Sequence, residues 1–180
     1  LVEKQGGLIR TKSPVKRFLV KGDEAIGIET PQGEVRADWV VDCAGAWAGF
    51  DESLKFKIPA LPVKGQMLRF RTEGPLFKRV VKSPRAYFVQ RSDDQLVVGT
   101  TVECVGYDKN LTPEGTDAIQ KGAAEISSRV KGWNPEARWA GLRPVAPDRL
   151  PILGASPVKR LLLATGHFRN GILLAPLTGR

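Results

Sequence analysis

Short apolar and polar stretches alternate through the first fifty residues of the chain, as they do in β-structure. Turn-forming sequences at 21–23 and 31–33 separate these stretches. Residues 37–44 then form a nearly continuous apolar run, which predicts a strand buried on both faces, as in a parallel sheet. The run ends in a small-residue turn at 45–49, where a ligand or another backbone can come close. The earlier predicted strands are 7–11, 15–21, 25–30 and 33–38.

The middle of the chain has a different pattern, because apolar and polar residues alternate after Gly65. This alternation predicts that 61–71 is a half-solvated antiparallel strand. Strands at 80–90 and 95–103 are expected to form a hairpin across residues 92–94.

A helix is predicted to begin after Thr112, which is a good N-cap, with Pro113 at its first position. It should run to about residue 130 and stop near Gly132. The remaining predicted elements are strands at 138–144 and 161–165 and an apolar helix at 172–177.

The segment 166–176 joins the last predicted strand to this final helix and is the most informative part of the chain. It contains the chain's only histidine, His167, together with Arg169 and Asn170. Backbone N–H groups and the positive end of the helix dipole at such a turn suit an anionic or electron-rich ligand. The arginine can also pair with a carboxylate.

The 180 residues are enough for one sizeable core, or for one domain and part of another. No stretch is long and apolar enough to predict a membrane span, and the start has no signal-peptide pattern. The first residue is Leu1, and the final apolar helix has barely one turn before the end, so we expect a fragment trimmed at both ends. A composition shift between residues 49 and 62 marks the best candidate for a domain boundary.

The cysteines and the net charge narrow the class of protein. Cys43 and Cys104 lack disulfide or metal spacing, so we expect buried free thiols and a reducing compartment, the cytoplasm. A net charge of +9 is compatible with a nucleic-acid surface, but no nucleic-acid module signature is present. We therefore favour a solvated basic face, or a chain without a more acidic half. The basic positions include Lys64, Arg69, Arg71, Lys78, Arg79, Lys82, Arg85 and Arg91.

Several kinds of chemistry find no support in the sequence. There is no Cys/His/Asp cluster for a metal, no nucleophile elbow, no G-x-G-x-x-G and no P-loop. Arg143 lies among apolar neighbours on a predicted central strand and needs an anion. A ligand carboxylate and a structural ion pair with Asp148 are both open alternatives. Tyr87 faces either a pocket or the core, and the alternation around it favours the core.

Five segments occur in one order along the chain: VVDCAGAW at 40–47, LPVKGQ at 61–66, VVGTT at 97–101, WAGLRP at 139–144 and GHFRNGILLAP at 166–176. Together they resemble the C-terminal part of FAD-dependent amino-acid oxidases of the D-amino-acid oxidase family. The resemblance is strongest to the glycine oxidases tied to thiamine biosynthesis in bacteria. It is collinear and extends over essentially the whole chain. The last two segments are its specific part, whereas the Ala-Gly-Ala-Trp turn is common to many flavoproteins.

The resemblance implies roles for individual residues. Arg143 would bind the substrate carboxylate, Arg169 would be a second substrate contact, and Tyr87 would line the active site. The backbone of Val15 would meet the adenine end of FAD. The other residues that the resemblance brings close to FAD are Ala44, Gly45, Ala46, Trp47, His167, Phe168, Arg169, Asn170, Gly171, Ile172 and Leu173.

The resemblance also implies an α+β fold. Residues 1–50 would be part of a Rossmann-like FAD-binding domain, to which a truncated segment at 141–180 returns. Residues 51–140 would form the substrate-binding domain, with a mixed, mainly antiparallel sheet and flanking helices.

The implied reaction is hydride transfer from the amino-acid Cα to the flavin. The resulting imine hydrolyses to a 2-oxo acid and ammonia, and molecular oxygen reoxidises the flavin to give hydrogen peroxide. The cofactor carries this chemistry and the protein orients the substrate. Glycine, sarcosine, small D-amino acids and proline all remain open as substrates.

One departure from the family pattern limits these implications. Because the glycine-rich loop for the FAD pyrophosphate does not occur in the sequence, we expect this chain alone to bind FAD weakly and to be inactive. One alternative is a non-catalytic substrate-domain fragment that acts as a binding module or forms a homodimer. Another is a related dehydrogenase that passes electrons to a quinone or a partner protein.

Overall fold

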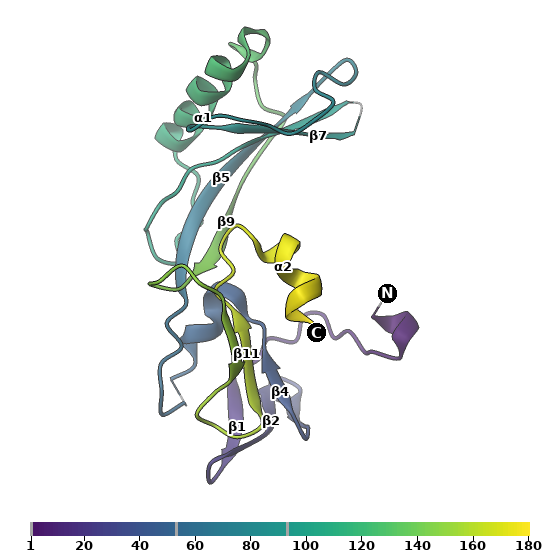
Figure 1. The fold of residues 1–180 in the computed structure, drawn as a ribbon, viewed down its shortest axis with the longest axis vertical. Helices are drawn as coiled ribbons and strands as arrows, with labels where there is room; N and C mark the ends of the chain where they lie inside the picture. The colour runs from purple at the N-terminus through teal and green to yellow at the C-terminus, as the bar shows by residue number, and fades with distance from the viewer. Residues whose placement is uncertain (1, 53, 93) are drawn as a thin grey trace. The chain divides into compact units, whose positions relative to one another are not determined.

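The computed structural model describes residues 2–52, 54–92 and 94–180, which divide into two compact units (Figure 1). Unit 1 comprises residues 1–60 and 144–180, and unit 2 comprises Leu61–Arg143. Antiparallel sheets occur together with α-helices, which confirms the predicted α+β class. No helix within the described residues is long and apolar enough to cross a membrane.

The first sheet of unit 1 is an antiparallel meander of β1 (Arg17–Lys21), β2 (Glu24–Thr30) and β3 (Gly33–Arg36). These strands confirm three of the four strands predicted in this part of the chain, with small differences at their ends. Gly27 has a φ of +147° in β2, and a Cβ there would lie 2.1 Å from the carbonyl oxygen of Val35. A glycine is therefore needed where β2 approaches β3.

The strand predicted at 7–11 is wrong. This segment follows the short 3-10 helix η1 (Glu3–Gln5) and is not part of a strand. Its apolar residues Leu8 and Ile9 are 75% and 54% exposed. The two side chains suggested a strand, but the described part of the protein offers them no sheet face to cover.

The second sheet of unit 1 has the order β10 (Ile152–Ala155), β11 (Leu161–Thr165) and β4 (Val40–Asp42). The pair β10–β11 is antiparallel and the pair β11–β4 is parallel, as the apolar run before residue 44 had suggested. The expectation that this run is buried on both faces is wrong, because β4 is an edge strand of three residues and Val41 is 53% exposed.

Apolar side chains from both ends of the chain form the core of unit 1. The 3-10 helix η2 (Gly45–Phe50) follows β4 and contributes to this core. Its buried members are Ala25, Ala48, Leu54, Ile58, Ala60, Leu161 and Leu163.

Unit 2 is a five-stranded sheet covered by one long helix (Figure 1). The strand order is β6-β7-β8-β5-β9, and the helix α1 spans Pro113–Ile126. Ile119 and Ala123 of α1 pack on the sheet residues Phe70 and Phe88, all at most 1% exposed. The strands are β5 (Leu61–Arg71), β6 (Val81–Lys82), β7 (Tyr87–Ser92), β8 (Gln95–Gly99) and β9 (Ala137–Val145), of which β9 extends two residues into unit 1.

The start of α1 was predicted correctly and its end was not. The Thr112 hydroxyl accepts a hydrogen bond from the backbone N–H of Gly115, at 3.1 Å, and Pro113 takes the first helical position. The helix ends at Ile126, four residues before the predicted end. The Ser127 hydroxyl accepts from the N–H of Arg129 and starts a separate 3-10 turn, η3 (Ser128–Val130).

The antiparallel pairing of β7 with β8 confirms the predicted hairpin, although Asp93 in its turn lies outside the described residues. The single strand predicted at 80–90 is wrong, because a turn interrupts it. The N–H and the hydroxyl of Ser83 both donate to the carbonyl of Ala86, so β6 and β7 become two paired strands. Strand β9 confirms the strand predicted at 138–144 but lies at the edge of the sheet rather than its centre.

Three expectations about side-chain burial are wrong. Cys43 and Cys104, predicted to be buried thiols, are exposed. Lys64, counted with a solvated basic face, is 1% exposed. Each prediction came from local context, whereas the burial of these residues depends on which side of a strand the rest of the unit covers.

Asp42 is a buried acid of unit 1, at the end of β4 and only 4% exposed. Its Oδ1 accepts a hydrogen bond from the N–H of Ala44, at 2.8 Å, whereas its Oδ2 has no hydrogen-bond partner in the described part of the chain. Burial raises the pKa of Asp42 above its usual range; the Ala44 N–H opposes this shift and the charge of Asp51 adds to it.

We expect Asp42→Asn to stabilise the protein at neutral pH and not in acid. Because the folded-state pKa is raised, the stability linked to the protonated acid is present below the unfolded-state pKa and is lost as the pH rises through the folded-state pKa. The neutral amide avoids this loss, so the free energy of unfolding at neutral pH should rise by on the order of 1 kcal/mol.

Thermal unfolding of both proteins in acid and at neutral pH measures the difference. Asp38→Asn removes an exposed carboxylate close by and serves as the control. An equal gain for Asp42→Asn at both pH values would contradict the expected linkage.

Candidate functional site

Two turns lie at the same edge of the parallel pair β4–β11. Leu161 is paired with Val40 in parallel register, so the carboxyl ends of both strands meet at this edge. The Thr165 hydroxyl donates to the carbonyl of Gly45, at 2.8 Å, and joins the end of β11 to the turn after β4. Ligands of α/β proteins commonly bind outside the carboxyl ends of parallel strands.

The turn after β4 contains four of the residues predicted to approach a cofactor. Gly45 has a φ of +61°, a left-handed conformation that favours glycine. The N–H of Trp47 then donates to the carbonyl of Ala44, at 3.1 Å. Ala46 is 1% exposed and packs inward, whereas Trp47 is 47% exposed. The buried side chain of Ala46 therefore anchors the turn, and the indole of Trp47 is partly exposed.

A pocket of about 580 Å³ in unit 1 brings Val15, Ala44 and Trp47 together. Its walls are mainly apolar, and the buried carboxyl of Asp42 with its unpartnered Oδ2 belongs to its lining. Mainly apolar walls with a few polar groups suit a flat heteroaromatic ring with a polar edge, so these residues fit the adenine end of FAD. The remaining lining residues are Pro14, Lys16, Arg17, Phe18, Ile28, Val40, Val41, Cys43, Ala48 and Asp51.

The turn after β11 is held by its own backbone. Gly166 has a φ of +77° and Phe168 a φ of +51°. The N–H of Phe168 donates to the carbonyl of Pro144, at 2.8 Å, and the N–H of Asn170 donates to the carbonyl of His167, at 3.0 Å. These contacts fix the path of the segment that carries the other predicted cofactor residues.

Helix α2 (Gly171–Thr178) begins at the end of this turn. Its N-cap, Asn170, makes no side-chain capping bond, so this side chain does not use the first backbone N–H groups of the helix. His167 Nε2 lies 3.0 Å from the hydroxyl of Thr178 and ties the turn to the far end of the helix. Ile172 and Leu173 are 95% and 80% exposed, so their side chains are not part of the core of unit 1.

Arg169 is exposed in the same turn, and its guanidinium carbon lies 5.4 Å from the centre of the Phe168 ring. This distance is within the range of a cation–π contact. The Phe168 ring thus helps to orient the guanidinium of Arg169.

Tyr87, one of the predicted substrate residues, belongs to unit 2. It lies on β7 opposite Gly99 of β8, which lies opposite Met67 of β5. The Tyr87 hydroxyl is 3.5 Å from the sulfur of Met67, and the side chain is half-buried. A Cβ on Gly99 would lie 2.4 Å from that sulfur and 3.0 Å from the Tyr87 hydroxyl. The absence of a side chain at Gly99 makes room for both groups.

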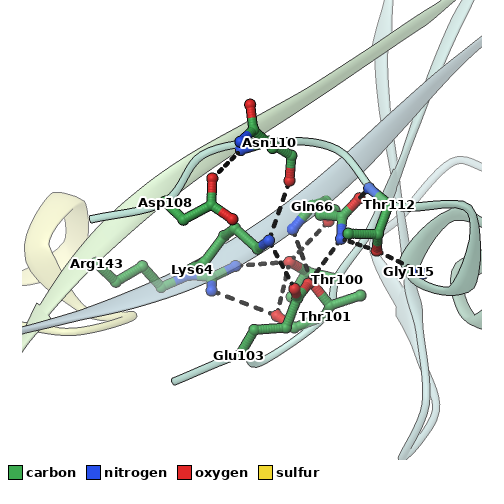
Figure 2. Close-up of polar contacts among 10 residues, drawn as sticks. All are labelled: Lys64, Gln66, Thr100, Thr101, Glu103, Asp108, Asn110, Thr112, Gly115 and Arg143. Carbon is green, nitrogen blue, oxygen red and sulfur yellow. Dashed lines mark hydrogen bonds and ion pairs between the residues drawn. The ribbon is translucent and has the colours of Figure 1, made fainter. Parts of the chain in front are cut away.

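Arg143 lies near the same end of β8 (Figure 2). Its Nη2 donates to the Thr100 hydroxyl at 2.6 Å, and its Nη1 donates to the carbonyl of Thr101 at 3.5 Å. Because Thr100 follows Gly99 directly, unit 2 brings the supports of Arg143 and the strand partner of Tyr87 together. The proposed alternative partner of Arg143, Asp148, and the second predicted substrate residue, Arg169, are both residues of unit 1.

Residues that the sequence analysis missed surround this arginine. Lys64 had been assigned to a solvated face, and Gln66 and Glu103 had received no role. In the structure the three side chains form one polar cluster (Figure 2). The signal in the sequence was the polar pair Lys64 and Gln66 on either side of a glycine, inside a strand with buried neighbours.

The described residues contain no group of three or more His, Cys, Asp or Glu side chains that could hold a metal ion.

The whole chain, residues 1–180, matches the family described as DAO: FAD dependent oxidoreductase. Glycine oxidase of Pseudomonas aeruginosa is 37% identical over 174 residues, which are 96% of this chain and 48% of that protein. The bifunctional protein ThiO/ThiG of Nostoc sp. is 41% identical over 169 residues, which are 91% of this chain and 25% of that protein.

Solved structures give the same assignment. Glycine oxidase from Bacillus cereus is similar with a TM-score of 0.86 at 30% identity, over 97% of this chain and 49% of that one. L-proline dehydrogenase from P. horikoshii has a TM-score of 0.86 at 25% identity, over 98% of this chain and 50% of that one. The chain spans about half the length of the glycine oxidases that it matches. Since the family match extends over every residue and the fold agrees with it, the chain belongs to the DAO family of FAD-dependent oxidoreductases.

Proposed function

We propose that this chain takes part in the FAD-dependent oxidation of glycine or another small amino acid. The observation that carries the proposal is the guanidinium of Arg143, which Thr100 and Thr101 hold beside the strand partner of Tyr87. A guanidinium with a fixed orientation suits a carboxylate, because its planar fork can donate two parallel hydrogen bonds. The similarity to glycine oxidases supports a small amino acid as the source of that carboxylate.

In this proposal, unit 2 is the substrate-binding part of the chain. Arg143 binds and orients the substrate carboxylate, and Tyr87 lines the space for the small side chain. A terminal nitrogen of Arg143 carries two N–H groups, so it can serve a threonine and a second acceptor together. Little acid–base chemistry is required of the protein, which fits a site built from an arginine, a tyrosine and threonines.

Unit 1 is the cofactor-binding part in the same proposal. The pocket at Val15, Ala44 and Trp47 holds the adenine end of FAD, and the backbone of the turn at 167–173 approaches the flavin. When bound, FAD supplies the acceptor for the hydride from the amino-acid Cα, and water converts the imine product to a 2-oxo acid and ammonia. Because the sequence contains no G-x-G-x-x-G, we expect this chain alone to bind FAD weakly and to show no turnover.

The electron acceptor defines a second candidate function. Similarity to glycine oxidases favours molecular oxygen, whereas the similarity to an L-proline dehydrogenase leaves a dehydrogenase as the alternative. Hydrogen peroxide produced in step with amino-acid consumption supports the oxidase. Turnover that needs an added quinone and gives no peroxide supports the dehydrogenase.

We expect Arg143→Met to weaken the binding of acetate, a minimal carboxylate, by about 10- to 100-fold, because a charge-assisted pair is lost. Titration calorimetry on the purified protein measures this affinity. Arg138→Met is the matched control, since Arg138 is an exposed arginine on the same strand. Equal acetate affinities for the two variants would exclude Arg143 as the carboxylate ligand.

We expect the pocket of unit 1 to bind ADP, which carries the adenine end of FAD, and Trp47→Ala to weaken this binding about tenfold through the loss of a stacking surface. Trp39→Ala is the control, because Trp39 is 61% exposed in unit 1 and does not line this pocket. Chemical-shift changes during an ADP titration give the affinity and the residues involved. Changes at Val15 and Ala44 are expected, and their absence would remove the pocket from the proposal.

A further inference from the structure

A cluster of buried polar side chains in unit 2 is not explained by the roles proposed for Tyr87 and Arg143 (Figure 2). Its centre is an ion pair, with 2.8 Å between Lys64 Nζ and Glu103 Oε2. The Lys64 side chain is 1% exposed and that of Glu103 is 22% exposed. Lys64 also donates to the carbonyl of Asn110, at 3.0 Å. Buried ion pairs often stabilise a fold no better than apolar residues of similar volume, so this pair calls for a role besides stability.

Partners occupy both carboxylate oxygens of Glu103. Oε1 accepts hydrogen bonds from Gln66 Nε2, at 2.8 Å, and from the Thr101 hydroxyl, while Oε2 faces Lys64. Burial alone would raise the pKa of Glu103, but the hydrogen bonds from these three partners and the charge of Lys64 outweigh it and hold the pKa below its usual range. Glu103 is therefore a carboxylate whose charge is balanced inside the cluster.

Gln66 connects this ion pair to helix α1. Its Oε1 accepts from the N–H of Thr112 at 3.1 Å, and its Nε2 donates to the Thr112 hydroxyl at 3.0 Å. The same Nε2 donates to Glu103, so the side-chain amide uses its donors and its acceptor within the cluster. A Cβ on Gly115 would lie 2.1 Å from this Nε2, so the first turn of α1 is shaped to receive the amide. The orientation of Gln66 is thus fixed from two sides.

Thr100 and Thr101 connect this hydrogen-bonded cluster to Arg143. The Thr101 hydroxyl accepts from the N–H of Gln66, at 2.9 Å, and donates to Glu103. The Thr100 hydroxyl accepts from Arg143 Nη2, at 2.6 Å, and can donate to the carbonyl of Gln66, at 3.0 Å, or to that of Thr101, at 3.2 Å. Whichever of the two carbonyls takes the Thr100 proton, the oxygen of this hydroxyl remains the acceptor for Arg143, so an unbroken set of hydrogen bonds joins Glu103 to the guanidinium.

Gly65 supplies the space in which the guanidinium lies. A Cβ at this position would lie 2.2 Å from each terminal nitrogen of Arg143 and 2.5 Å from its Cζ. These distances are too short for real contacts, so any side chain on Gly65 would displace the guanidinium from the threonine pair. The strand backbone at Gly65 acts as one wall and the threonines act as the other.

We propose that Lys64, Gln66 and Glu103 are positioning residues, which fix the guanidinium of Arg143 through Thr100 and Thr101 for a substrate carboxylate, and that Gly65 sets the place of that guanidinium. Lys64 balances the charge of Glu103 inside the cluster. The proposal rests on the proposed function, in which Arg143 binds the carboxylate.

The test compares acetate with acetamide, its neutral isostere, by titration calorimetry on the purified protein. The ratio of the two affinities reports the carboxylate-specific part of binding and is insensitive to a general loss of folded protein. We expect Gly65→Ala and Glu103→Gln each to lower this ratio about tenfold, because a displaced guanidinium loses a charge-assisted hydrogen bond.

Matched controls lie in the same unit. Gly141→Ala adds a methyl group to the strand of Arg143 where nothing lies within 4 Å. Glu114→Gln removes an exposed carboxylate at the start of α1. Both controls should leave the acetate-to-acetamide ratio unchanged, and a fall equal to that of Gly65→Ala would overturn the proposal.

A double variant covers the case in which Glu103→Gln does not fold, because it leaves Lys64 buried without its partner. Lys64→Met with Glu103→Leu replaces the ion pair by apolar side chains and should fold, as circular dichroism would show, yet lose the same factor in the ratio. A folded double variant with the parental ratio would show that the ion pair is only structural and would overturn the proposal.

Arg143→Met separates this inference from the proposed function. If it lowers the ratio while Gly65→Ala and the double variant do not, Arg143 binds the carboxylate without help from the cluster, and only the positioning role fails. If Arg143→Met itself leaves the ratio unchanged, the proposed function fails at this residue, and the positioning role fails with it.

Discussion

The parallel pairing of β4 with β11 is the contact on which the rest of unit 1 depends. It joins segments from opposite ends of the chain, and the hydrogen bond from Thr165 to Gly45 closes a separation of 120 residues. The pocket, the small-residue turn and the turn before α2 all take their places from this pair. Pairings over such a distance in sequence form slowly, because the loop must close before the contacts stabilise it. Most of the intervening residues form unit 2, which has its own sheet and core.

Local signals in the sequence were sufficient for many elements of the fold. Thr112 and Pro113 predicted the start of α1 because a cap and a fixed φ act within one turn of the chain. The apolar run at β11 predicted a buried strand, and β11 lies between two neighbours in its sheet. Burial on both faces of β4 was not predictable in the same way. The run of residues is similar, but β4 is at an edge, and sheet order is a property of the whole unit.

The residues of the candidate site likewise divide into those that local sequence could single out and those that it could not. Arg143 could be singled out because an arginine among apolar residues needs an anion, and the tail with His167 could be singled out by its polar residues between two apolar elements. The pairing of Lys64 with Glu103 could not be predicted, because the two residues meet only when β5 passes the segment after β8. Their ion pair and their burial both result from the tertiary structure, so the sequence around either residue does not predict them. The family resemblance suggested which residues touch ligands and was silent about what holds them in place.

The close approach between Gly65 and the guanidinium of Arg143 also has an evolutionary consequence. The residue that is tolerated at position 65 depends on the residue at position 143, although the two positions lie on different strands. A methyl group at position 65 displaces the guanidinium of a lineage that keeps the arginine, whereas a lineage that has lost the arginine can fill the space without that effect. The order of the two changes therefore matters, because a side chain acquired at position 65 after the loss of the arginine would occupy the place of a returning guanidinium. Loss of Arg143 would in that way become difficult to reverse.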